Sequence, residues 1–126
     1  MTINQSIKIN TSPANVYQAI TSEDQFSKVT GAAADISKDE GGAFSCFGGQ
    51  IVGRHIELVP NERIVQAWRV NMWPEGVYSI VRFNISASGD ATTLELVQTA
   101  YPDDAAEHLE SGWHKMYWDP LKAYLE

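Results

Sequence analysis

The fold is decided by residues 103–126, which read DDAAEHLESGWHKMYWDPLKAYLE. Apolar side chains recur here at spacings of three and four, which predicts an amphipathic helix with one apolar stripe. Gly112 is expected to let this helix approach a neighbouring element closely. Pro120 lacks the N–H that would bond the carbonyl of Met116, so we expect the helix to kink or divide there. The stripe is formed by Leu109, Trp113, Met116, Tyr117, Leu121 and Tyr124.

Upstream of this helix, from about residue 32, the apolar period changes to two, which is typical of strands. Short turn signals separate the apolar runs and predict about six antiparallel strands joined by hairpins. The turn signals are Gly41-Gly42, Gly48-Gly49, Pro60-Asn61, Pro74-Glu75-Gly76 and Ser88-Gly89-Asp90. The inward faces predicted by alternation hold Phe44 and Cys46; Trp68, Val70 and Met72; Val81, Phe83 and Ile85; and Leu94 and Leu96.

The beginning of the chain predicts one strand and two short helices. Residues 3–9 alternate weakly and indicate a strand. Ser12 followed by Pro13 predicts the start of a helix, Ser22 predicts the start of a second, and Gly31 ends it. Helices grouped apart from an antiparallel sheet make an α+β fold. We therefore expect a curved sheet wrapped around the long C-terminal helix.

Length and charge narrow the classes of function. The 126 residues suit a single domain over residues 1–126, and the net charge is −7, from 16 acidic and 9 basic residues. Such a chain, without a run of Lys or Arg, is not expected to bind nucleic acid. No apolar run reaches the ~20 residues that span a bilayer, so we expect no membrane association and a soluble, cytoplasmic protein. Cys46 is the only cysteine and cannot form an internal disulfide.

The order of these elements, together with a set of short motifs, resembles the helix-grip fold of the SRPBCC (START/Bet v 1-like) superfamily. Within it the chain resembles the activator of heat-shock-protein-90 ATPase homologue family, and the resemblance covers essentially the whole chain. The motifs are Thr11-Ser12-Pro13, Val16-Tyr17, Ala19-Ile20-Thr21, Gly41-Gly42-x-Phe44, Gly53-x-x-x-Glu57-Leu58-Val59-Pro60, Ile64-Val65, Trp68-Arg69, Pro102 and Gly112-Trp113.

Two of the segments are more specific. Trp68-Arg69-x-x-x-Trp73-Pro74-Glu75-Gly76 and Gly112-Trp113-x-x-x-Tyr117 resemble the C-terminal domain of the eukaryotic co-chaperone of this family. The resemblance implies a role beside a stress chaperone, with Trp73 and Glu75 as candidate residues for protein interaction. A Trp next to a hairpin turn either contacts a partner or folds over the sheet edge.

A ligand site is the second function that the sequence suggests. Helix-grip relatives often keep an apolar cavity between sheet and helix, so our leading hypothesis is a non-enzymatic domain that binds a small hydrophobic molecule there. The alternative is that the same side chains fill the space completely. The candidate lining residues are Phe44, Trp68, Phe83, Leu96, Trp113, Met116 and Tyr117, with either Arg54 or His55 as a polar group, since alternation does not decide which of the two points inward.

An enzyme of the cyclase or hydrolase kind known on this fold is the third hypothesis. It requires convergent polar groups, and only Arg54, His55 and Tyr117 can be nominated, so we assign no catalytic residue and no cofactor. Cys46 has apolar neighbours on its strand and is interpreted as a buried, inert thiol. His108 and His114 are six apart on the helix and point to different sides, so no metal site is predicted.

Overall fold

The computed structural model describes residues 2–126, and its frame is a seven-stranded antiparallel sheet with the order β1-β7-β6-β5-β4-β3-β2. Each central strand has one buried and one more exposed face, which is why its apolar residues alternate along the sequence. The predicted α+β helix-grip fold is confirmed. The strands are β1 (Thr2–Ile9), β2 (Asp35–Ile36), β3 (Ala43–Cys46), β4 (Ile51–Val59), β5 (Arg63–Val70), β6 (Ser79–Ser88) and β7 (Ala91–Thr99).

The helices α1 (Pro13–Thr21) and α2 (Glu23–Thr30) begin at the predicted residues, and α2 ends at Gly31 as predicted. Ser12 Oγ accepts a hydrogen bond from the backbone N–H of Asn15 at 3.2 Å, and Ser22 Oγ accepts one from Gln25 at 3.3 Å. Gly31 ends α2 in the left-handed conformation, with φ 71°, which costs glycine little because it has no Cβ.

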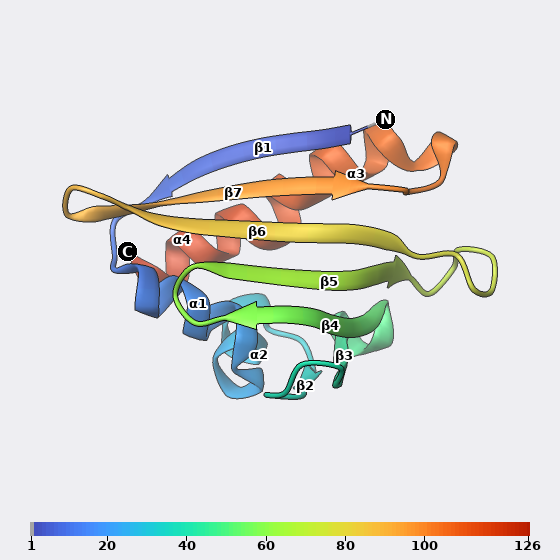
Figure 1. Cartoon of the computed structure of the whole chain (residues 1–126), viewed down its shortest axis with the longest axis horizontal. Coiled ribbons are helices and arrows are strands. Elements are labelled where there is room, and N and C mark those ends of the chain that lie inside the picture. Colours follow the sequence, from blue (N-terminus) through green and yellow to red (C-terminus); the bar gives the residue numbers. More distant parts are fainter. Residues whose placement is uncertain (1) are drawn as a thin grey trace.

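The helices lie on one face of the curved sheet and leave the opposite face uncovered, as Figure 1 shows. The C-terminal helix consists of α3 (Ala106–Gly112), a π-helical segment η3 (Trp113–Trp118) and α4 (Asp119–Leu125). Two short 3₁₀ helices complete the fold, η1 (Phe47–Gly49) after β3 and η2 (Asp103–Ala105) before α3. No helix within residues 2–126 is long and apolar enough to cross a membrane.

The π-helical segment changes which aromatic side chains reach the core. The N–H of Asp119 bonds the carbonyl of His114, five residues back, so this turn holds one residue more than an α-helical turn. Trp118, which the predicted stripe omitted, is therefore 1% exposed, whereas Met116, which the stripe included, is 39% exposed. The chain stays helical from α3 into α4, so the irregularity predicted near Pro120 takes the form of a π-helical segment that precedes the proline and does not break the helix.

The core between sheet and helix is filled largely by aromatic rings. Trp113 stacks on Trp68 with ring centroids 5.3 Å apart and on Trp118 at 5.5 Å, and it meets Phe83 edge-on at 5.8 Å. The predicted inward position of Met72 is wrong: β5 ends at Val70, and Met72 lies in the following turn with 88% of its surface exposed. The turn breaks the alternation that placed it inside.

Candidate functional site

An open cleft of about 670 Å³ lies on the helix side of the sheet. One wall comes from η1, the start of β4 and the end of β5, and the other from α3 and η3. Aromatic and aliphatic side chains form most of its surface. The cleft is lined by Phe47, Gln50, Ile51, Trp68, Val70, His108, Leu109, Ser111, Gly112, Trp113, Lys115, Met116 and Tyr117.

Four of the predicted ligand residues meet at this cleft: Trp68, Trp113, Met116 and Tyr117. Met116 lies there although it is partly exposed, which places it at the rim. Leu96 is buried in the sheet and lines neither this cleft nor the smaller space described next. The predicted residues therefore divide between the cleft wall and the interior behind it.

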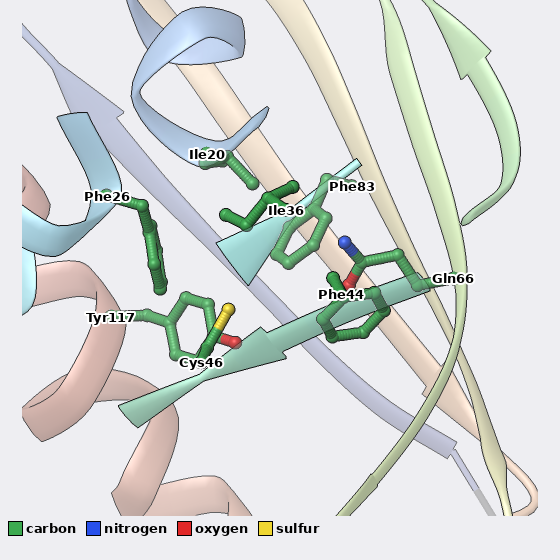
Figure 2. A pocket seen from close by; sticks show the side chains of 8 residues that line it. All are labelled: Ile20, Phe26, Ile36, Phe44, Cys46, Gln66, Phe83 and Tyr117. Carbon is green, nitrogen blue, oxygen red and sulfur yellow. The ribbon is translucent and has the colours of Figure 1, made fainter. Parts of the chain in front are cut away.

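A second, much smaller space lies among buried side chains of the core and measures about 10 Å³. Figure 2 shows the side chains around it, with Tyr117 entering from the C-terminal helix and Gln66 from the sheet. This volume is at the lower limit for one water molecule, so an organic ligand does not fit. It is lined by Ile20, Phe26, Ile36, Phe44, Cys46, Gln66, Phe83 and Tyr117.

Buried hydrogen bonds hold the two indole rings of the cleft. Trp113 Nε1–H donates to Gln98 Oε1 at 2.8 Å, and Gln98 Nε2 donates to Ser79 Oγ at 3.0 Å. Trp68 Nε1–H donates to the hydroxyl of Tyr117 at 3.3 Å. Burial raises the pKa of Tyr117, so the hydroxyl stays protonated at neutral pH. Because both N–H groups have partners, the ring faces are fixed before anything enters the cleft.

Arg54 and His55, left as alternatives by the sequence, lie on opposite sides of β4. His55 is 1% exposed and stacks on Phe44 with centroids 5.5 Å apart, and its Nε2 lies 3.0 Å from the carbonyl of Ser37. Arg54 is exposed and its Nη1 donates to the carbonyl of Gly41 at 3.0 Å. A β-bulge between His55 and Glu57 shifts the register, which explains why strict alternation gave no answer. Neither residue lines the cleft.

The burial of His55 predicts a loss of stability at acidic pH. Desolvation lowers its pKa below 6.5, and the backbone hydrogen bond to Ser37 opposes this shift. The Nδ1 atom has no hydrogen-bond partner among the described residues, so a proton added there would remain unpaired. The unfolded chain takes up that proton below pH ~6.5, so the stabilising effect is present above this pH and is lost as the pH falls.

We expect the free energy of unfolding, measured in urea from pH 8 to 5, to fall by up to about 1.4 kcal/mol per pH unit below pH ~6.5. His55→Gln should remove this component of the slope, because glutamine does not titrate. His108→Gln, at an exposed position, is the matched control and should retain it. Equal slopes in the parent and the His55→Gln protein would show that His55 is not the group responsible.

Cys46 lies in a setting unsuited to nucleophilic chemistry. It is buried, and burial raises its pKa to about 12, so the thiolate is scarcely populated at neutral pH. Within residues 2–126 no group of three or more His, Cys, Asp or Glu side chains is placed to hold a metal ion. His108 and His114 are both exposed on the C-terminal helix.

The Trp73 loop, residues 71–78 between β5 and β6, is held against the end of the sheet. Trp73 is half-buried, and its ring meets Trp68 edge-on at 5.9 Å. Arg69 donates from Nη2 to the carbonyl of Trp73 at 2.6 Å and from Nε to the carbonyl of Val77 at 3.1 Å. Glu75 is exposed at the tip. Of the two candidate interaction residues, one therefore packs partly on the fold and the other faces solvent.

Phe47 is the cleft residue that sequence reasoning missed most clearly. It adopts φ 56°, and its ring lies 5.5 Å from that of Tyr117. The sequence predicts a simple hairpin turn at the adjacent Gly48-Gly49, whereas the chain forms η1 there and directs Phe47 inward. The two glycines indicate that the chain turns here, but the contact of Phe47 with Tyr117 of the C-terminal helix depends on residues far away in the sequence.

The chain is similar in sequence to proteins described as activators of the 90 kDa heat shock protein ATPase. Residues 10–126 match the family described as Activator of Hsp90 ATPase homolog 1-like protein. A Dictyostelium discoideum protein named activator of 90 kDa heat shock protein ATPase homolog is 36% identical over 112 residues, which cover 88% of this chain and 29% of that protein. The human activator homolog 1 is 30% identical over 112 residues, covering 89% of this chain and 33% of its own length.

The chain thus spans about a third of these relatives. The crystal structure of an HSP90 activator from Plasmodium falciparum superimposes with a TM-score of 0.93 at 24% identity, covering 99% of this chain and 96% of that one. The matching fold and the match over residues 10–126 agree. The chain belongs to the Activator of Hsp90 ATPase homolog 1-like protein family.

Proposed function

We propose that this domain binds a small apolar molecule in the open cleft between the C-terminal helix and the wall formed by η1, the start of β4 and the end of β5. The cleft volume of about 670 Å³ lies within the range of roughly 300–1,000 Å³ usual for small-molecule sites. Its mostly apolar wall suits an aromatic or aliphatic ligand. The much smaller space of about 10 Å³ behind it leaves the cleft as the place for such a molecule.

The observation that carries this proposal is the partly exposed apolar wall of the cleft. Ile51 and Val70 are half-buried there, and Met116 is 39% exposed. Behind this wall the buried Trp68 and Trp113 stack on each other, and the N–H of each is bonded inside the core. A ligand that covers the wall gains apolar burial without first ordering the core behind it. Met116 at the rim is flexible enough to adjust to ligands of different shape.

A titration with the neutral apolar dye Nile red tests the site. We expect saturable binding to the parent protein that weakens about tenfold or more in Met116→Trp, because the larger ring occupies the cleft. Tyr124→Trp is the matched control, since Tyr124 is as exposed as Met116, lies on the same helix and is outside the cleft lining. It should change affinity by less than about twofold. Non-saturable binding, or the same loss in both variants, would refute the site.

Regulation of a chaperone ATPase is the second candidate, and it is favoured by the two relatives named as activators of the 90 kDa heat shock protein ATPase. We propose that the Trp73 loop makes the contact, because it offers Glu75 and a half-buried aromatic side chain at one end of the sheet. In a steady-state ATPase assay with a purified 90 kDa heat-shock protein, the domain should change the rate, and Glu75→Lys should abolish that change.

Asp90→Lys is the matched control, since Asp90 is exposed in the β6–β7 turn at the opposite end of the sheet. An unchanged ATPase rate with the parent domain, or equal loss in both variants, would argue against this contact. An enzymatic role has less support: the polar residues lining the cleft, Gln50, His108, Ser111 and Lys115, are all exposed.

A further inference from the structure

The face of the sheet opposite the helices carries every arginine of the chain. We call the outward side chains of β4, β5 and β6 the outer face; they belong to the side of the sheet that is turned toward the viewer in Figure 1. Arg54, Arg63, Arg69 and Arg82 all belong to it, and of the five lysines only Lys8, on β1, lies on the same side of the sheet. Strand pairing places Arg82 opposite Val65, and Arg54 opposite Ala67.

The outer face has the opposite charge to the rest of the protein. Within β4–β6 its four arginines are accompanied by one carboxylate, Glu57, which pairs with Arg63 at 2.6 Å. On the neighbouring strand β7, Glu95 lies on the same side of the sheet and accepts a hydrogen bond from Asn84 Nδ2 at 2.9 Å. The outer face therefore carries +3 while the whole chain carries −7, so the remaining residues carry −10. Charges further apart than the Debye length of ~10 Å are largely screened at moderate salt, so a short ligand on this face responds mainly to the local cations.

Apolar side chains lie among these cations. Ile80 is 40% exposed and Ile56 is 50% exposed. Ala67 pairs with both Arg54 and Ile80, so an arginine and an isoleucine flank it on neighbouring strands. Arginines interleaved with apolar residues are typical of protein–protein contact surfaces.

The arginines differ in how many donors remain free. The side chain of Arg82 has no hydrogen bond or ion pair within residues 2–126, and the side chain of Arg54 makes a single hydrogen bond, to the carbonyl of Gly41. Arg69 instead holds the Trp73 loop. Arg54 and Arg82 are therefore the two residues best able to donate bidentate hydrogen bonds to carboxylates.

From this arrangement we propose that the outer face docks an acidic segment of a protein partner, in which carboxylates alternate with apolar side chains. Arg54 and Arg82 bind the carboxylates, and Val65, Ala67 and Ile80 bind the apolar residues between them. A nucleic acid is the less favourable occupant, since a long polyanion also meets the charge of −10 on the rest of the chain. The outer face lies on the other side of the sheet from the cleft, so the proposal does not depend on ligand binding there.

Fluorescence anisotropy with a labelled peptide of alternating glutamate and leucine tests this proposal. We expect saturable binding at low ionic strength that weakens as salt is raised, and no binding of the matched peptide of alternating lysine and leucine. The double variant Arg54→Glu/Arg82→Glu should weaken binding about tenfold or more. The milder Arg82→Gln should weaken it less, without reversing charge.

Lys28→Glu/Lys38→Glu is the matched control, because it changes the net charge equally at two exposed positions away from the outer face. It should alter affinity by less than about twofold. Equal losses in the two double variants would show that only net charge matters and would overturn the proposal, as would the absence of saturable peptide binding. Tighter binding of a single-stranded oligonucleotide, with the same dependence on Arg54 and Arg82, would assign the surface to nucleic acid and overturn it as well.

Discussion

Replacing Trp113 with alanine should lower the free energy of unfolding by about 3–5 kcal/mol, the usual cost of truncating a large core side chain. Trp113 is buried at the start of the π-helical segment, where it stacks on Trp68 and Trp118 and meets Phe83 edge-on. Its removal leaves a cavity at the contact between three strands and the helix. It also removes the indole N–H that donates a hydrogen bond to the side-chain oxygen of the buried Gln98.

Urea denaturation followed by far-ultraviolet circular dichroism measures this loss. Trp113→Phe separates the two contributions, because it retains a ring but leaves Gln98 Oε1 without its donor, which should cost about 1–3 kcal/mol. Met116→Ala, at a partly exposed position on the same π-helical segment, should cost less than Trp113→Ala. A loss below about 1 kcal/mol for Trp113→Ala would place this side chain outside the cooperative core.

Gly53→Ala is expected to be comparably severe although it adds a single methyl group. A Cβ at Gly53 would lie 1.9 Å from the carbonyl oxygen of Ala67 and 2.8 Å from the ring of Phe44. The first neighbour is backbone of the adjacent strand, so it cannot rotate away, and β4 must separate from β5. We expect a loss of about 3 kcal/mol, the upper end for overpacked sites.

Gly112→Ala is the matched control for that substitution. A Cβ at Gly112 would meet nothing within 4 Å, and the residue has helical φ and ψ. Alanine should therefore stabilise the protein by up to about 1 kcal/mol through its higher helix propensity. The expectation that Gly112 permits close approach to the sheet is thus wrong, because the residue faces the open cleft. Similar stability of the Gly53→Ala and parent proteins would mean that the two strands adjust freely.

Gly53 also explains one of the motifs by which the sequence resembles its family. Gly53 opens the motif Gly53-x-x-x-Glu57-Leu58-Val59-Pro60, and the structure gives it a physical reason in the close approach of β4 and β5. The caps at Ser12, Ser22 and Gly31 were likewise predictable, since each depends on the chemistry of one residue and its near neighbours. The burial of Trp113 was predictable as well, because the helical spacing of apolar residues holds up to Trp113, where the π-helical segment begins.

The candidate cleft was predictable only in part. Trp68, Trp113 and Tyr117 could be assigned to it because they lie on predicted inward faces, and those faces do meet. Phe44, Phe83 and Leu96 share the same patterns, yet they lie in the interior behind the cleft. Burial periodicity identifies the face of an element, but the depth of a residue along that face depends on which other elements cover it.

The sequence by itself determined the order of the elements, the helix caps, the antiparallel sheet and the aromatic character of the core. Only the tertiary structure decided that Trp118 replaces Met116 inside, that His55 rather than Arg54 points inward, and that Phe47 lines the cleft. A π-helical turn and a β-bulge each add one residue to a regular element and shift the face presented by everything after them. Packing against distant segments stabilises these irregularities, so the spacing of apolar residues in the local sequence does not predict them.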